Sequence, residues 1–536
     1  MTAHTVSNDY ARQQALVTAL LDMHRFPHAA QNVRLVETHI SWVLLAGRYA
    51  YKIKKAVDLG FLNFTGLEAR RFYCAEEIRL NRRLAPKIYL DVMPIGGAPD
   101  APEFGAQPAI EYAVRMKRFA VAKEFDQLLL RGKILPQHMD QLAATLAIFH
   151  RGLPRAEAGS AFGTAAAIRA AAMQNFEQML SLLTAPCERD ALNKLSAAST
   201  DAFAACEKYF ERRHAQGWVR ECHGDLHLGN IVLIGDLPVP FDGIEFNPAL
   251  RWIDVMDEVA FLVMDMLHAQ RPDLAYRFLN AYLEITGDYA GVAVLRFYLA
   301  YRAAVRAKVS AIRACQPEHD QPIQAQALVA CRDYLALAGD CLSGRRPALI
   351  ITHGLPGSGK STFAQAALER LQAIRIRSDV ERKRLFGMHP LEASHSDVGG
   401  GIYSADATRR TYDRLSELAR VQLEAGFPVI VDAAFLMRAE REQFRSLAQN
   451  LSVPFVIASR PASTATLSAR IVRRRKAASD ASEADIDVLH RLQAAQQPLQ
   501  PHELMRVVEF KNDADDGKIS ADVAGWSRLD KLLAAL

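Results

Sequence analysis

The sequence predicts two domains of different fold class: an α+β domain of two lobes over residues 1–340 and an α/β domain with a parallel sheet over residues 346–536. The first is predicted because short β-rich runs precede a long stretch of helical periodicity. The second is predicted because strands and helices alternate after the turn-rich segment 339–347. That alternation is typical of a parallel sheet with helices on both faces.

The first domain is expected to begin with a small lobe of β-rich runs around one helix. Apolar residues at helical spacing after Asp9 predict an opening helix, and two β-rich runs joined around Gly47 predict a hairpin. A large helical lobe should follow and carry a loop-rich insert. The expected segments are a helix at 9–24, a hairpin from 40–45 and 49–53, a helix at 67–84, strands near 88–95 and 109–116 separated by the turn-rich GGAPDAPEFG, mostly helix over 123–215, the insert at 219–246, and helix over 253–340.

The second domain contains five short apolar runs that predict strands, and helix-compatible sequence follows each of the first four. These runs are ALIITHG, AIRIRSD, FPVIVDA, VPFVIAS and RVVEF.

The composition is that of a globular protein able to bury large cores, with 50% hydrophobic and 23% charged residues. A net charge of +5 gives no case for a dedicated nucleic-acid surface. Seven cysteines without a CxxC pair favour a reduced compartment over a disulfide framework or a zinc site. The N-terminus lacks a signal-peptide core and no apolar run reaches about 18 residues, so a cytoplasmic protein without a membrane span is expected.

The most specific motif is the GxxxxGK[ST] match, a P-loop. Its residues are Gly354, Leu355, Pro356, Gly357, Ser358, Gly359, Lys360, Ser361 and Thr362. The glycines allow backbone N–H groups to surround phosphates, and the N-terminus of the following helix adds a favourable dipole. We expect Lys360 to reach the β- and γ-phosphates of ATP, and Ser361 to hold Mg²⁺.

Two aspartates and an Arg-rich helix accompany the P-loop. Asp379 follows the second predicted strand, Asp432 ends the third, RIVRRRK occupies 470–476, and the guanine-binding NKxD signature is absent. This set resembles P-loop kinases of small substrates and of polynucleotide 5′-hydroxyls, and more loosely gluconate kinases and zeta-toxin-like kinases. The resemblance implies that Asp379 takes the proton of the acceptor hydroxyl and that Asp432 is the Walker B carboxylate at the metal.

The same resemblance assigns three arginines. Arg382 would grip the substrate, and Arg470 and Arg474, at i and i+4 on one helical face, would close over ATP as a lid. Simpler readings stay open: Asp379 as a helix cap, Asp432 as a structural residue, and the Arg-rich helix as a solvated face.

A second signature, His-Gly-Asp-Leu-His-Leu-Gly-Asn, occupies residues 223–230. Its spacing suits phosphoryl transfer, because Asp225 can orient an acceptor hydroxyl while Asn230 coordinates a metal. Asp242 follows in a Phe-Asp-Gly sequence and is expected to bind Mg²⁺. The apolar runs 231–234 and 239–241 predict a hairpin between them.

This pattern resembles the aminoglycoside phosphotransferases, over most of residues 35–310, and implies a protein-kinase-like fold for the first domain. Lys52, in the run Tyr-Lys-Ile-Lys, would then contact ATP and pair with Glu77 on the following helix. Lys54 lies on the same strand face and stays open as an alternative. Of the glycine-rich loop of protein kinases only Gly47 is present. The whole chain resembles a two-domain family that joins such a domain to a P-loop kinase domain.

Four other polar residues receive structural expectations. His223 should shape the catalytic loop, His227 should be structural, Asp254 should tie the loop or cap a helix, and His353 should pack or face solvent.

The leading functional hypothesis is an ATP- and Mg²⁺-dependent phosphotransferase with two sites, each transferring the γ-phosphoryl group to a hydroxyl of a small molecule or a polynucleotide 5′ end. One alternative makes one domain, more readily the first, a nucleotide-binding regulator of the other. A further alternative makes the P-loop domain an ATP-hydrolysing switch. The acceptors, the coupling between the sites and the oligomeric state are not specified by the sequence.

Overall fold

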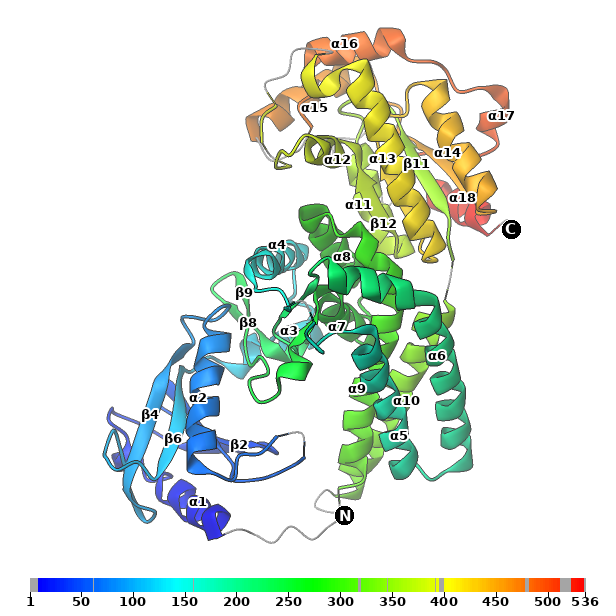
Figure 1. Cartoon of the computed structure of the whole chain (residues 1–536). Helices are drawn as coiled ribbons and strands as arrows, with labels where there is room; N and C mark the ends of the chain where they lie inside the picture. The colour runs from blue at the N-terminus through cyan, green and yellow to red at the C-terminus, as the bar shows by residue number, and fades with distance from the viewer. Residues whose placement is uncertain are drawn as a thin grey trace. The chain divides into compact units, whose positions relative to one another are not determined.

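The computed structural model describes residues 8–60, 62–157, 159–316, 320–344, 346–390, 392–394, 400–477, 482–510 and 522–534. The chain forms two compact units that alternate along the sequence (Figure 1). The first comprises Met1–Ile168 with Glu211–Leu262, and the second comprises Arg169–Phe210 with Val263–Leu536. The domain ranges 1–340 and 346–536 stay a prediction. None of the described helices combines the length and apolar character needed to cross a membrane.

The first unit contains both sheet and helix. Its elements are α1 (Asn8–Ala19), η1 (Met23–Arg25), β1 (Arg34–Glu37), β2 (Ser41–Ala46), β3 (Tyr49–Lys54), α2 (Leu67–Asn81), β4 (Tyr89–Ala98), β5 (Ala101–Phe104), β6 (Glu111–Lys117), η2 (Val121–Lys123), α3 (Phe125–Leu130), α4 (Pro136–Gly152), β7 (Val219–Glu221), η3 (Leu228–Asn230), β8 (Ile231–Ile234), β9 (Leu237–Pro240), η4 (Pro248–Leu250) and β10 (Trp252–Asp254). The division between the units falls inside α5 (Ala165–Leu182), α6 (Pro186–Ala215) and α7 (Val255–His268).

Six antiparallel strands form the main sheet of this unit, in the order β1-β2-β3-β6-β4-β5. The predicted hairpin of β2 and β3 is confirmed, and Gly47 at its turn has a φ of 58°. Apolar side chains of α1, β2 and β3 form one core, which includes Leu16, Trp42, Tyr51 and Ile53. Figure 1 shows α2 lying along β4 and β6, whose residues form a second core with it.

The expected turn in GGAPDAPEFG is present at residues 99–100, but strand extends further toward it on both sides than expected. β4 continues to Ala98 and pairs with β5 in a further hairpin. Gly97 permits this turn, because a Cβ there would lie 2.5 Å from the carbonyl oxygen of Ala101. Phe104 packs its ring against Tyr51 at a centroid distance of 4.7 Å, so this hairpin is drawn onto the apolar core.

The second unit begins with helices and ends with a parallel sheet. Beyond the helices shared with the first unit it contains α8 (Pro272–Thr286), η5 (Tyr289–Gly291), α9 (Val292–Ala314), α10 (Gln321–Ser343), β11 (Leu349–His353), α11 (Lys360–Leu371), β12 (Ile374–Arg377), α12 (Ser378–Leu385), η6 (Gly401–Tyr403), α13 (Ala405–Glu424), β13 (Val429–Asp432), α14 (Arg438–Asn450), β14 (Phe455–Ser459), α15 (Thr464–Ala477), α16 (Ile486–Ala495), α17 (Pro501–Leu504), β15 (Val507–Glu509) and α18 (Val523–Leu533).

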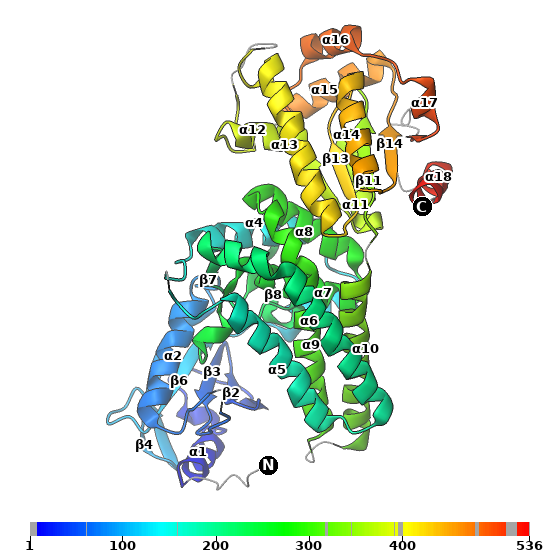
Figure 2. The same cartoon turned by 45° about the vertical axis from the view of Figure 1, so that its right-hand side comes forward.

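All five predicted strands of the second half are present and parallel, in the order β12-β13-β11-β14-β15. Figure 2 shows α13 and α14 side by side along this sheet. The strand order reverses at β11, which lies between β13 and β14. In open α/β sheets ligands bind beyond the carboxyl ends of the strands at such a switch point. The predicted classes, α+β for the first half and α/β with a parallel sheet for the second, are confirmed.

Candidate active sites

The first candidate site centres on Lys52 in the middle of β3. Its Nζ lies 2.7 Å from Oδ1 of Asp242 and 2.9 Å from Oε1 of Glu77. Glu77 comes from α2 and Asp242 follows β9, so three distant segments converge here. Burial alone would lower the pKa of Lys52, but the Asp242 and Glu77 carboxylates outweigh it and hold that pKa well above its ordinary value. Lys52 therefore remains a cation.

Lys54 is the second lysine of this cluster and is completely buried. It donates to Oε2 of Glu77 at 2.7 Å and to the Glu245 carboxylate. Burial raises the pKa of Glu245 despite the attraction of Lys54. For Glu77 the two lysines overcome the effect of burial and lower its pKa to about 2. Sequence reasoning missed Glu245, although it lies only three residues beyond Asp242.

The turn after β9 presents Asp242 to this cluster. Its backbone is left-handed, with a φ of 61°, and its N–H donates to the Tyr89 hydroxyl at 3.0 Å. The N–H of Gly243 donates to Oδ1 of Asn81 at 2.7 Å. These bonds fix the turn while the Asp242 side chain stays 44% exposed. A carboxylate that is both fixed and accessible suits a magnesium ion.

Asp225 and Asn230, both from the loop motif at residues 223–230, contact each other directly. Nδ2 of Asn230 donates to the carbonyl oxygen and to Oδ2 of Asp225, both at 3.0 Å. This leaves the amide oxygen of Asn230 as its atom for a metal. The Asp225 side chain is 36% exposed, and Nε2 of His227 lies 3.5 Å from it. The predicted β8–β9 hairpin follows immediately and is confirmed.

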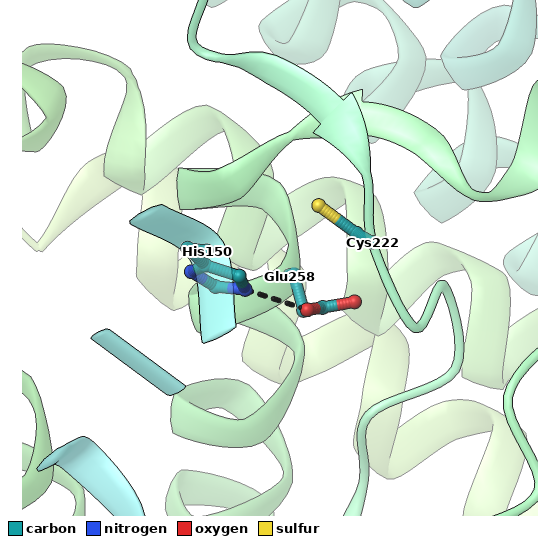
Figure 3. Close-up of side chains that lie close together, drawn as sticks. All are labelled: His150, Cys222 and Glu258. Atoms are coloured by element: carbon teal, nitrogen blue, oxygen red, sulfur yellow. Dashed lines mark hydrogen bonds and ion pairs between the residues drawn. The ribbon is translucent and has the colours of Figure 1, made fainter. Parts of the chain in front are cut away.

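Buried groups support the backbone of this loop. Oε1 of Glu258 accepts the N–H groups of His223 and Gly224 at 2.6 and 2.7 Å. Its Oε2 lies 2.7 Å from Nε2 of His150 (Figure 3). The donor atoms of His150, Cys222 and Glu258 lie within 4.8 Å of one another, as in a metal site. Both Glu258 oxygens are already occupied, however, and burial raises the pKa of the Cys222 thiol well above its usual range. We therefore interpret the three residues as support for the loop.

The remaining polar residues of the first half have structural contacts. Nε2 of His223 lies 2.8 Å from the carbonyl oxygen of Phe241, which links the loop to the Asp242 turn. Asp254 pairs with Arg213 at 2.7 Å and accepts the N–H of Met256 at 2.9 Å, at the start of α7.

The P-loop connects β11 to α11, as the motif requires. Gly357 and Gly359 both have a φ of 80°, a conformation that favours glycine. A Cβ on Gly357 would lie 2.8 Å from the carbonyl oxygen of Leu467 in α15. Lys360 is the first residue of α11, and its Nζ donates to the carbonyl oxygen of Leu355 at 2.9 Å. The loop therefore has the local geometry expected of a phosphate cradle.

Asp432 lies at the carboxyl end of β13, next to the P-loop. Burial raises its pKa, although Arg377, Arg375 and a hydrogen bond with Ser361 act in the opposite direction. Its Oδ2 is buried and has no hydrogen-bond partner among the described residues. An unsatisfied buried carboxylate oxygen beside a serine hydroxyl is a donor set that fits Mg²⁺.

Asp379 and Arg382, the residues predicted to serve the acceptor, lie on α12. The N-cap of this helix is Arg377, so Asp379 is its second residue and does not cap it. Asp379 is half-buried, whereas Arg382 is only 7% exposed. Nη1 of Arg382 donates to the carbonyl oxygen of Ile402 at 2.8 Å. This bond ties Arg382 to the segment before α13. Its role in binding a substrate stays a prediction.

The Arg-rich helix α15 packs on the P-loop through Leu467 and Ile471, which contact Leu355. Arg470 is half-buried, and the side chain of Arg474 lies outside the described residues. Sequence reasoning missed Arg460, a buried residue after β14 whose Nε lies 3.4 Å from the carbonyl oxygen of Ser358. Burial, and then the nearby Arg470, lower the pKa of Arg460 to about 10.

Known proteins resemble the P-loop half of the chain and, at lower identity, most of its length. Residues 349–499 match a family model described as AAA domain. A protein of Mycobacterium tuberculosis described as uncharacterized is 29% identical over 473 residues, which is 86% of this chain and 92% of the relative. The adenylyl-sulfate kinase of Vibrio cholerae is 34% identical over 109 residues, which is 20% of this chain and 47% of that enzyme.

Among solved structures, a choline/ethanolamine kinase family protein from Mesorhizobium loti is similar over 60% of this chain and 99% of its own, with 14% identity and a TM-score of 0.37. A score this low carries no inference. The match of the P-loop half and its likeness to adenylyl-sulfate kinases confirm the predicted enzyme class, a kinase or phosphotransferase.

Proposed function

We propose that the chain is an ATP-dependent phosphotransferase with two nucleotide sites, each moving the γ-phosphoryl group of ATP to a hydroxyl acceptor. The observation that carries the proposal is that Lys52 Nζ lies within 2.9 Å of a carboxylate oxygen of both Glu77 and Asp242. These residues come from three segments with no common local motif. The Asp225–Asn230 pair is connected to this cluster through the backbone, because the N–H of Phe241, the residue before Asp242, donates to the carbonyl oxygen of Asn230 at 2.9 Å. This arrangement supports a second site in addition to the P-loop.

In the first site Lys52 would bind the ATP phosphates, which requires it to exchange Asp242 for a phosphate oxygen. Asp242 and the amide oxygen of Asn230 would then hold Mg²⁺, which neutralises phosphate charge during transfer. Asp225 would orient the acceptor hydroxyl and take its proton. Asn230 fixes the Asp225 carboxylate at 3.0 Å and so limits the directions from which the acceptor can approach.

In the second site the P-loop N–H groups and Lys360 would hold the phosphates, and Ser361 with Asp432 would hold Mg²⁺. Asp379 would serve the acceptor, with Arg382 as its partner. The similarity to adenylyl-sulfate kinases supports an acceptor with a hydroxyl on a small or nucleotide-like molecule. A polynucleotide 5′-hydroxyl belongs to the same chemical class.

The test uses the full chain, γ-labelled ATP and a panel of sugars, aminoglycosides, small alcohols, nucleotides and 5′-hydroxyl oligonucleotides. Asp225→Asn should abolish labelling of one group of acceptors, and Asp379→Asn that of another. Asp91→Asn, at a partly exposed ion pair, and Asp406→Asn, at an exposed one, serve as controls. Labelling that survives both active-site changes would contradict both aspartate assignments. Loss with only one change would leave the other half as a nucleotide-binding regulator.

A further inference from the structure

Helix α8 contributes a carboxylate to the end of β12, although it lies outside the region 349–499 matched by the AAA model. Oε1 of Glu284 lies 2.8 Å from Nη1 of Arg377, and Oε2 lies 2.9 Å from Nη2 of Arg375. These side chains are 11–19% exposed, so water screens the pairs weakly. All of these residues belong to the second compact unit.

Hydrogen bonds between side chains of α8 and its C-terminal flank and the backbone of β12 and the residue before it fix the position of α8. Asn280 accepts the N–H of Arg375 at 2.6 Å and donates to the carbonyl oxygen of Ala373 at 2.9 Å. The Tyr289 hydroxyl, just beyond α8, donates to the carbonyl oxygen of Arg375 at 3.3 Å. Glu284 is therefore held at a defined place beside the strand.

Arg377 lies between Glu284 and the carboxylate that fits magnesium. The parallel register of β12 and β13 places Arg377 directly opposite Asp432. Nε of Arg377 is 3.8 Å from Oδ2 of Asp432, which is too long for a hydrogen bond, whereas its Nη1 makes a 2.8 Å bond to Glu284. Of these two carboxylates, Glu284 therefore lies closer to the Arg377 guanidinium than Asp432 does.

We propose that Glu284 is a positioning residue for the metal site of the P-loop half: it holds Arg377 away from Asp432 and keeps Oδ2 available for a divalent cation. The inference rests on the proposed function of this site. If Glu284 lost its charge, Arg377 could close the remaining distance and form a direct ion pair with Asp432. That pair would compete with Mg²⁺ for the same oxygen.

The experiment measures ADP binding to the full chain by calorimetry, with and without Mg²⁺, and follows the binding component that disappears in Lys360→Met. Glu284→Gln should raise the Mg²⁺ concentration for half-maximal binding by about 10-fold, as expected for an outer partner of a metal ligand. Metal-free ADP affinity should stay within about twofold. Glu369→Gln is the matched control, because Glu369 also bonds α8, through Arg277 at 3.0 Å, but does not contact Arg377.

The decisive variant is Glu284→Gln combined with Arg377→Gln. If Glu284 acts through Arg377, the second change restores the low Mg²⁺ requirement, whereas independent damage would add. Glu284→Asp, which keeps the carboxylate, should raise the requirement less than Glu284→Gln and is available if that variant folds poorly. A Mg²⁺ requirement in Glu284→Gln equal to that of Glu369→Gln, or an additive double variant, overturns the proposal. Absence of any Lys360-dependent binding in the unmodified chain would instead contradict the proposed function.

Discussion

The two candidate sites hold their charged groups in opposite ways. In the first, Lys52 and Lys54 are neutralised by Glu77, Glu245 and Asp242 inside the protein. In the second, the loop expected to surround the phosphates is formed by main-chain groups. Lys360 donates to a main-chain carbonyl, and one carboxylate oxygen of Asp432 has no hydrogen-bond partner among the described residues.

The charged side chains therefore have different roles in the two candidate sites. A buried ion pair that loses one partner leaves an uncompensated charge in a poor solvent, so the lysines and glutamates of the first site are part of what stabilises its fold. The P-loop obtains its shape from glycine conformations and helix α11, so its lysine can be removed without unfolding the loop. Substitution of the buried lysines should therefore lower stability as well as ligand binding in the first site, whereas substitution of Lys360 should mainly lower ligand binding in the second.

The largest effect is expected from Asp225→Asn, which removes the group that we propose takes the acceptor proton. Phosphoryl transfer by the first site should fall about 10²–10⁴-fold. Steady-state rates with an acceptor of that site measure the loss, and transfer by the P-loop half should be unchanged. Equal loss at both sites would show that the two halves do not act independently.

The next largest effect is expected from Lys54→Met, because this change leaves Glu77 and Glu245 buried with one cation fewer. We expect the free energy of unfolding of the first unit to fall by about 3–5 kcal/mol. Denaturant titration measures the change. The control is Arg71→Met, at an exposed pair with Glu68, which should cost no more than about 0.5 kcal/mol. A loss as small as that of the control would contradict a structural role for the cluster.

His353 is a buried titratable group of the P-loop half, beside Ser459 at 3.1 Å. Burial, and then Arg441 and Lys360, lower its pKa to about 4. Between pH 6.5 and 4 the unfolded chain therefore binds more protons than the folded one, and stability falls as the pH is lowered. The expected loss is about 3 kcal/mol. His353→Asn should flatten the pH dependence of unfolding in this window, and an unchanged slope would exclude His353 as its source.

Lys360→Met should change the free energy of unfolding least, by about 1 kcal/mol, because the ligand-free protein loses the hydrogen bond from Lys360 to the carbonyl oxygen of Leu355. The main effect of this substitution should appear when ATP is present. ATP at about 100 times its dissociation constant raises the free energy of unfolding of a site by about 2.7 kcal/mol, and the Lys360→Met variant should lack this stabilisation of the P-loop half. Thermal unfolding with and without Mg²⁺·ATP measures it. Marked instability of the ligand-free variant would show that the second site depends on its side-chain charge as the first does.

The same contrast explains how much could be predicted from the sequence. The P-loop is contiguous, so the strand before Gly354, the helix at Lys360 and the parallel sheet could all be predicted from local pattern. The loop at residues 223–230 and the β8–β9 hairpin could also be predicted, because each is formed by a contiguous stretch of sequence. Lys52 and Glu77 could be proposed because a family resemblance related their positions to the loop.

Residues that act through tertiary contacts could not be predicted this way. Glu245 and Glu258 read as ordinary acidic residues, and only the fold brings them to Lys54 and to the backbone of His223. Glu284 lies more than 90 residues before its partner Arg377, with no motif between them. Gly97 could be predicted as part of a turn-rich segment, but the pairing of β4 with β5 around it could not, because it depends on the packing of Phe104 on Tyr51.

The central claim is that one chain carries two independent ATP sites. Calorimetric titration with a non-hydrolysable ATP analogue and Mg²⁺ tests it most directly, in the unmodified chain and in Lys52→Met, Lys360→Met and the double variant, each first checked for folding. The account predicts two equivalents of nucleotide per chain, one in each folded single variant and none in the double variant. A single equivalent in the unmodified chain, lost entirely in either single variant, would contradict it.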